Sequence, residues 1–318
     1  MNKIPDVVVM GSHAAGTGQA RVHKLPSPGE SITAWKFNII KDGGKASHKA
    51  MILSKYGVNV GFIGMMGTDQ RSKIGIQWLI DHHVNIDKLL LVDDYRISEA
   101  GSLMLLDDNG NNMIIMIESV KKRLTFEQAE PLIKDYKDAK IFITDFEIPF
   151  DTAMKGIKLA KELGMYTVLN PSPIPDQPLG ILDFVDLICP NETEAKMMLE
   201  IPLSATYDPL DLCERLIKRY QVRQVVITLG ADGAIYHDKD ETCSVPSLKI
   251  KAVDPSGAGD NFISSFLYAH NICGKSISTA MDWANHAAAL SVSRPGSIDS
   301  FPTKQEVDAF TIDFNEYH

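Results

Sequence analysis

Short apolar runs alternate with amphipathic segments along most of the chain. Residues 7–10 are four apolar residues in a row, which is typical of a strand buried on both faces of a sheet. The expected strands are 7–10, 58–63, 139–146, 165–170, 185–189 and 224–229, and the expected helices are 45–56, 72–81, 149–163, 191–199, 209–220 and 281–292. This order predicts an α/β fold with a mostly parallel sheet covered by helices on both faces.

One region breaks the alternation of strands and helices. Apolar runs at 102–106 and 113–117 flank an Asn-Gly turn, which predicts a β-hairpin. Alternate apolar positions predict a further strand within 32–40, exposed on one face. We expect a small second sheet from about 12–40 and 96–119, inserted in a single domain that spans 1–318. This sheet is either a flap that closes over a site or an edge hairpin, and the pattern favours neither.

A run of small residues between two acids, Asp254 to Asp260, lies where a strand expected at 245–253 passes into a helix that ends near Gly274. Glycines let the backbone turn tightly, and a helix N-terminus presents unpaired N–H groups and positive potential. Asp260 would then lie beside an anion-binding hole. The alternative is an ordinary turn whose acid stabilises the helix dipole, and the spacing alone does not choose between them.

Composition narrows the classes of partner. The net charge is −9, from 41 acidic and 32 basic side chains, which disfavours non-specific binding to nucleic acid. No apolar run approaches the roughly 20 residues that cross a bilayer, and the four cysteines form no CxxC pair. We expect a cytoplasmic chain with reduced cysteines that binds neither membrane nor nucleic acid.

Two common nucleotide-binding signatures are absent. Gly11 and Gly16 have the spacing of a P-loop, but Thr17 stands where that motif needs its lysine. The first expected strand is not followed by GxGxxG, which argues against a dinucleotide-dependent dehydrogenase.

Four segments together resemble the ribokinase family of sugar kinases: Gly43-Gly44-Lys45 opening a helix, Asn191-Glu192-Thr193-Glu194, residues 226–233, and residues 253–260. Residues 25–30 also look like the family's motif leading into its lid. The resemblance covers nearly the whole chain. It implies the ribokinase-like, doubly wound α/β fold with a small β-sheet lid, and an ATP-dependent kinase that phosphorylates a sugar hydroxyl.

The resemblance also implies site residues for catalysis and nucleotide binding. Asp260 corresponds to the catalytic base, and Gly257, Ala258 and Gly259 to the anion hole. Nucleotide and Mg²⁺ contacts are implied for Asn191, Glu194, Thr228, Gly230, Gly233, Gly259 and Asn285. Asn191 and Glu194 are explained equally well as a helix N-cap with an acidic first turn.

A monovalent-cation site, for K⁺, is implied as well. The corresponding positions are Asp254, Ser256, Ser291, Arg294, Gly296 and Ser300. The alternative is that Asp254 only caps its turn. By analogy the chain is also expected to form a homodimer through the lid.

The sugar side departs from the family pattern. The resemblance implies substrate contacts from Gly43, Gly44, Lys45, His48, Glu147 and Asp260. However, residues 11–29 contain no carboxylate, and His48 replaces the family's asparagine. With His13, Lys45 and Lys49 nearby, this predicts a substrate other than ribose, such as a sugar acid or another modified sugar. Alternatively, the histidines donate hydrogen bonds to sugar hydroxyls or face away. A nucleoside kinase of the same fold and a catalytically silent binding regulator are the rival functions.

Overall fold

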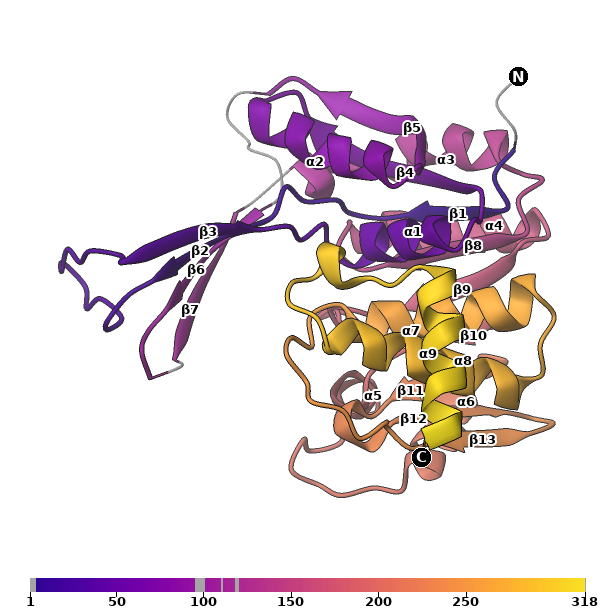
Figure 1. Ribbon diagram of the computed structural model, residues 1–318. Coiled ribbons are helices and arrows are strands. Elements are labelled where there is room, and N and C mark those ends of the chain that lie inside the picture. Colours follow the sequence, from indigo (N-terminus) through magenta and orange to yellow (C-terminus); the bar gives the residue numbers. More distant parts are fainter. Residues whose placement is uncertain (1–3, 95–100, 110, 118–119, 318) are drawn as a thin grey trace.

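A nine-stranded sheet forms the centre of the computed structural model, which describes residues 4–94, 101–109, 111–117 and 120–317 (Figure 1). The strand order is β13-β12-β11-β10-β9-β8-β1-β4-β5. Its strands are β1 (Val7–Met10), β4 (Val60–Gly67), β5 (Asn85–Val92), β8 (Ile141–Asp145), β9 (Tyr166–Asn170), β10 (Leu187–Ile188), β11 (Gln224–Thr228), β12 (Ala234–Asp238) and β13 (Thr242–Val245). All neighbours pair in parallel except β11–β12 and β12–β13. The predicted α/β class and mostly parallel sheet are therefore confirmed.

Helices cover both faces of this sheet. They are α1 (Lys45–Lys55), α2 (Gln70–Asp81), α3 (Phe126–Asp135), α4 (Phe150–Glu162), α5 (Glu192–Met198), α6 (Pro209–Tyr220), α7 (Ala258–Leu267), α8 (Ile277–Val292) and α9 (Lys304–Tyr317). Val7 and Val9 share one core with α1, α7 and α8, whereas Val8 and Met10 share the other with α3, α4 and α6. The apolar run 7–10 is thus buried on both sides, as its sequence predicts.

The lid is a separate four-stranded sheet, ordered β3-β2-β6-β7, that projects from the edge of the main body (Figure 1). Its strands are β2 (Thr17–Arg21), β3 (Lys36–Ile40), β6 (Gly101–Leu106) and β7 (Asn112–Ile117). The predicted hairpin corresponds to β6 and β7, which pair antiparallel. Residues 96–100, 110 and 118–119 of the expected lid segment lie outside the described residues.

The prediction of a strand over residues 245–253 is wrong. The strand there is β13, which ends at Val245, and residues 246–253 run irregularly toward the end of α8. Pro246 has no N–H to donate to a ladder, and the amides of Val253 and Asp254 bond instead to the carbonyl of Val292. The approach to the anion-hole motif is therefore a loop held by a helix end.

The remaining differences are elements that the sequence did not predict and one strand that starts later than expected. Strands β5 and β12 and helices α3 and α9 were not expected from the pattern, and β3 begins four residues later than 32. Within the described residues, no helix is long and apolar enough to cross a membrane.

Candidate active site

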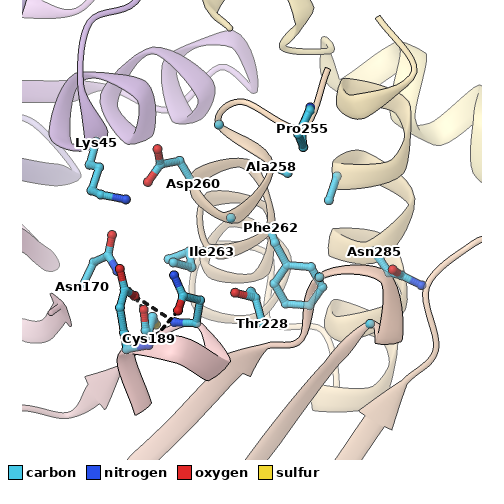
Figure 2. Close-up of a pocket in the computed structure, with 17 residues that line it drawn as sticks. Lys45, Asn170, Cys189, Thr228, Pro255, Ala258, Asp260, Phe262, Ile263 and Asn285 are labelled. Carbon is cyan, nitrogen blue, oxygen red and sulfur yellow. Dashed lines mark hydrogen bonds between the residues drawn. The ribbon is translucent and has the colours of Figure 1, made fainter. Parts of the chain in front are cut away.

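Eleven of the predicted site residues meet at the carboxyl-terminal edge of the main sheet, where parallel strands pass into helices, whereas Gly43, Gly44, His48, Glu147 and the proposed cation positions do not line the same cavity. A cavity of about 340 Å³ lies there, and its lining includes Lys45, Asn191, Glu194, Thr228, Gly230, Gly233, Gly257, Ala258, Gly259, Asp260 and Asn285. Figure 2 shows Lys45 and Asp260 at one end of this cavity and Asn285 at the other. The sequence interpretation missed six further lining residues: Asn170, Cys189, Pro255, Phe262, Ile263 and Ala288. No sequence motif marks these six as a group.

Asp260 lies in the first turn of α7 and is only 7% exposed. Gly257 caps this helix with φ of 77°, and a Cβ there would lie 2.9 Å from Phe301, so the position favours glycine on two grounds. The first amides of a helix lack intrahelical acceptors and point toward this end. The N–H of Ala258 donates to the carbonyl of Pro255 at 3.2 Å, which leaves it less available than its neighbours.

On the sugar side, the glycine pair before α1 brings the helix start close to the end of β8. Glu147 accepts hydrogen bonds from the backbone N–H of Lys45 at 3.0 Å and from the hydroxyl of Ser12 at 2.5 Å. Gly44 has φ of 85°, and a Cβ on it would lie 2.8 Å from Glu147. Burial alone would lower the pKa of Lys45, but Asp260 and other nearby carboxylates raise it above its usual value.

Both carboxylate oxygens of Asp260 have cationic partners on α1. The Lys49 ammonium lies 2.6 Å from Oδ1, and Nδ1 of His48 lies 2.9 Å from Oδ2. Nε2 of His48 lies 2.9 Å from Asp42, so the ring bridges two carboxylates. Lys49 drew attention in the sequence only as a nearby cation, because periodicity does not show which partner a buried lysine meets.

These contacts set the protonation states of Asp260 and His48. Burial would raise the pKa of Asp260, but Lys49 and His48 hold it well below its usual range. Burial would lower the pKa of His48, but Asp260 and Asp42 raise it to about 9. At neutral pH Asp260 is therefore an ionised carboxylate between two cations.

His13 lies apart from the cavity lining. Its ring is fully buried with edge contacts to Phe62 and Trp78, and Nε2 lies 2.7 Å from the carbonyl of Gly75. Burial lowers its pKa to about 4, so the ring is neutral. These contacts match the reading in which this histidine faces away from substrate.

On the phosphate side, Asn191 and Glu194 form a reciprocal capping box. Oδ1 of Asn191 accepts from the amide of Glu194 at 2.8 Å, and the carboxylate of Glu194 accepts from the amide of Asn191 at 2.9 Å. The backbone of Asn191 also forms a parallel β-bridge with Thr228, and both residues line the cavity, where Figure 2 shows Thr228. The cap explanation is thus observed, and the same residues face the pocket. A Mg²⁺ carried by nucleotide phosphates needs only one or two protein carboxylates, so Glu194 fits that ion.

At the far end, Gly230 and Gly233 form the turn between β11 and β12. The side-chain amide of Asn285 donates to the carbonyl of Pro246 at 2.8 Å. This hydrogen bond holds the Asn285 side chain against the loop that follows β13.

The proposed cation positions come from the loop before α7, the last turn of α8 and the segment that follows α8. The carboxylate of Asp254 accepts from the amide of Ser256 at 2.9 Å and from that of Gly296 at 3.2 Å. The buried hydroxyls of Ser291 and Ser300 lie 3.0 Å apart. The Arg294 side chain pairs with Glu306, so only its backbone carbonyl is suited to a cation. One carboxylate with nearby carbonyl and hydroxyl oxygens is a donor set that fits K⁺.

Comparison with known proteins identifies the family. Residues 20–304 match the model of the pfkB family of carbohydrate kinases. The chain is 28% identical over 286 residues to a bifunctional ribokinase/ribose-5-phosphate isomerase A of Fructilactobacillus sanfranciscensis, covering 90% of this chain and about half (52%) of that protein. It is 27% identical to a deoxyribokinase of Salmonella typhimurium, covering 98% of each.

Solved structures agree. The Arabidopsis thaliana ribokinase in complex with ribose and ATP matches with a TM-score of 0.87 and 25% identity, over 97% of this chain and 99% of that one. The family match spans most of the sequence and includes the cavity with its α7 turn. The chain belongs to the pfkB family of carbohydrate kinases, enzymes that phosphorylate a sugar hydroxyl.

Proposed function

We propose that this protein transfers the γ-phosphoryl group of ATP to a hydroxyl of a sugar or sugar derivative other than ribose. The observation that carries the proposal is the position of Asp260 in the first turn of α7, buried, ionised and facing the same cavity as Lys45 and Glu194. A related ribokinase structure was solved with both ribose and ATP, which supports ATP as the donor.

The chain's own groups divide the work of phosphoryl transfer. Asp260 orients the attacking hydroxyl and accepts its proton. The amides of Gly257 and Gly259 at the helix N-terminus stabilise the charge on the transferring phosphoryl group, with Lys45 adjacent. Asn191 and Glu194 would hold a nucleotide-bound Mg²⁺ through its water ligands, and that ion would neutralise charge on the phosphates.

The substrate assignment rests on the sugar side. Residues 11–29 supply no carboxylate, and the acidic acceptor Glu147 is already bonded to Ser12 and to the backbone of Lys45. Both nitrogens of His48 are occupied by carboxylates. Fewer free acceptors suit a substrate with fewer or altered hydroxyl groups, in keeping with the related deoxyribokinase.

The test is a kinetic survey with ATP and Mg²⁺ against pentoses, deoxypentoses, hexoses, sugar acids and nucleosides. We expect a modified sugar to give the highest kcat/KM. Ribose as the best substrate would contradict the substrate assignment, and a nucleoside as the best substrate would favour the rival kinase. Tight binding without turnover of any acceptor would favour the silent regulator.

We also propose that K⁺ occupies the loops around Asp254 and Gly296 and steadies the anion-hole turn. The Asp254 carboxylate already joins these loops through two backbone hydrogen bonds. Replacing K⁺ by Na⁺ or choline is expected to lower kcat, and equal rates in all three salts would leave Asp254 as a turn cap.

We further propose that two copies pair through the lid. Cross-strand partners share a face, and on one face of the lid these are Gly18, Ala20, Phe37, Ile39, Leu103, Leu105, Met113 and Ile115, all apolar or glycine. Phe37 and Ile39 are 60% and 61% exposed, an unusual exposure for side chains of this size. Sedimentation should show a dimer that Phe37→Asp converts to a monomer, and a monomeric parent would refute the pairing.

A further inference from the structure

The Lys49 side chain is completely buried, although it carries an ammonium group in the middle of a helix. Its Nζ donates to Oδ1 of Asp260 at 2.6 Å and to the carbonyl of Lys45 at 3.0 Å. A buried cation is tolerated only with a close anionic partner and further hydrogen bonds. Lys49 is therefore bound to the proposed base and to the helix turn that opens the sugar side.

The pair restricts where the base can point. With Lys49 on one oxygen and His48 on the other, the carboxylate plane of Asp260 is fixed from two sides. A carboxylate has about four lone-pair positions, so each oxygen keeps one for another donor. A substrate hydroxyl can therefore bond to Asp260 without displacing Lys49.

The pair also affects the proton that Asp260 takes. Protonating this carboxylate would leave the Lys49 ammonium buried beside a neutral group, which is costly. Phosphoryl transfer passes through a loose transition state, so Asp260 can stay ionised and orient the hydroxyl as the new P–O bond forms, and it then takes the hydroxyl proton.

We propose that Lys49 is a positioning residue for the kinase reaction, holding Asp260 ionised and in the orientation that receives the acceptor hydroxyl. This inference rests on the proposed function, because it takes Asp260 as the group that meets the substrate. The competing explanation is that Lys49 serves only to fill and stabilise the α1–α7 contact.

Other charged groups around Asp260 also contribute to the electrostatic potential at its carboxylate. From the α1 side these are Asp42, Lys45, His48 and Lys49, and from the end of β8 and the loop after it they are Asp145 and Glu147. Lys49 is the only fully buried cation among them in the part of the chain described. Removing Lys49 should therefore change the electrostatic environment of the Asp260 carboxylate the most.

The experiment compares Lys49→Met with the parent enzyme on the best acceptor found, from pH 5 to 9. We expect kcat to fall by about tenfold or more, since small misplacements of a reacting group cost up to about 100-fold, while KM for ATP changes by less than about twofold. Losing one adjacent cation raises a carboxyl pKa by about one to three units, so when the profile is extended below pH 5 the variant's kcat should begin to fall at a higher pH than the parent's.

Lys161→Met is the matched control. Nζ of Lys161 lies 2.6 Å from the buried carboxylate of Asp186. Asp186 directly precedes β10, at the amino-terminal end of the parallel strands, whereas the cavity lies at their carboxyl-terminal end. This variant also breaks a Lys–Asp pair, so it should melt at a lower temperature while keeping the parent's pH profile.

If Lys49→Met does not fold, Lys49→Gln is read by the same criteria, since it removes the charge but keeps a donor. A folded neutral variant with the parent's kcat and pH profile would overturn the proposal and leave Lys49 a packing residue. The double variant Lys49→Met/Asp260→Asn should regain melting temperature relative to Lys49→Met, because both charges are then absent. A parent that phosphorylates no acceptor, or an active Asp260→Asn, would instead refute the proposed function.

Discussion

The phosphate side and the sugar side of the cavity are built from different parts of the chain. On the phosphate side, the cavity is lined by the start of α7, by the Gly230–Gly233 turn and by the start of α5, whose first amides already bond within their capping box. On the sugar side the lining is the side chains of Lys45 and Asp260, and Asp260 belongs to a bonded network with Asp42, His48 and Lys49.

This difference has a physical consequence. Backbone donors have no proton to lose in the working pH range and need only the correct turn, so their strength depends on conformation. The sugar-side network is held by alternating buried charges, so it depends on protonation and on every member being present. The four predictions below test that contrast in order of decreasing expected effect.

Removing the carboxylate of Asp260 should have the largest effect on the sugar side. Asp260→Asn is expected to lower kcat by about 10³-fold or more while leaving KM for ATP within about threefold. It should also cost about 3 kcal/mol of unfolding free energy, because Lys49 then lacks its anion. Steady-state kinetics and urea unfolding measure the two effects. Full activity in a folded variant would remove Asp260 from the reaction.

Alkaline pH should lower the stability that the sugar-side network provides, because His48 loses its proton. Its folded pKa of about 9 lies above the unfolded value of 6.5, so its stabilisation is complete below pH 6.5 and is lost as pH rises through 9. A shift of this size corresponds to about 3 kcal/mol. Unfolding free energies at pH 6.5 and 9.5 should differ by roughly this amount more in the parent than in His48→Asn. An equal difference in both proteins would exclude His48 as the cause.

Altering the turn should break the phosphate side without any charge change. Gly257→Ala introduces a side chain at positive φ and against Phe301, which tilts the anion-hole amides. We expect kcat to fall by about 100-fold, comparable to the loss of one oxyanion donor. Gly274→Ala is the control, since it also has positive φ (68°) but no neighbour within 4 Å, and it should cost only about 1 kcal/mol of stability.

The smallest effect is expected from Glu147→Gln. One charge-assisted acceptor is weakened, so KM for the sugar should rise by about tenfold while KM for ATP stays within about twofold. Glu200→Gln, an exposed glutamate paired with Arg219, should change neither constant. An increase in KM for ATP alone would move Glu147 to the phosphate side.

Much of this architecture could be predicted from the sequence because it depends on local rules. The apolar run 7–10, the Asn-Gly hairpin and the glycine turn before α7 each require particular residues at particular positions, and each is found where expected. The same holds for most cavity residues named in the motifs, which lie where a strand or loop passes into a helix or turn, whereas Asn285 lies within α8.

The remainder depends on contacts between distant segments. The Lys49–Asp260 pair joins residues 211 positions apart, and no periodicity in either segment indicates it. Cys189, Phe262 and Ile263 line the cavity through ordinary apolar packing, which resembles any core position in sequence. The strand at 245–253 was wrongly expected for a related reason, since the partner of that segment is the end of α8 rather than another strand.

The long reach of His48 bears on how the protein is made. The ring contacts Asp260 and, at 3.1 Å, the hydroxyl of Ser297, which lies 249 residues away. A ribosome completes α1 and strands β1, β4 and β8 long before either partner emerges, so during most of synthesis Lys49 lacks its anion and His48 can meet Asp42 but not Asp260. Closure of α7 onto α1 then pairs both side chains with Asp260, which makes assembly of the proposed active site a late event in the folding of the nascent chain.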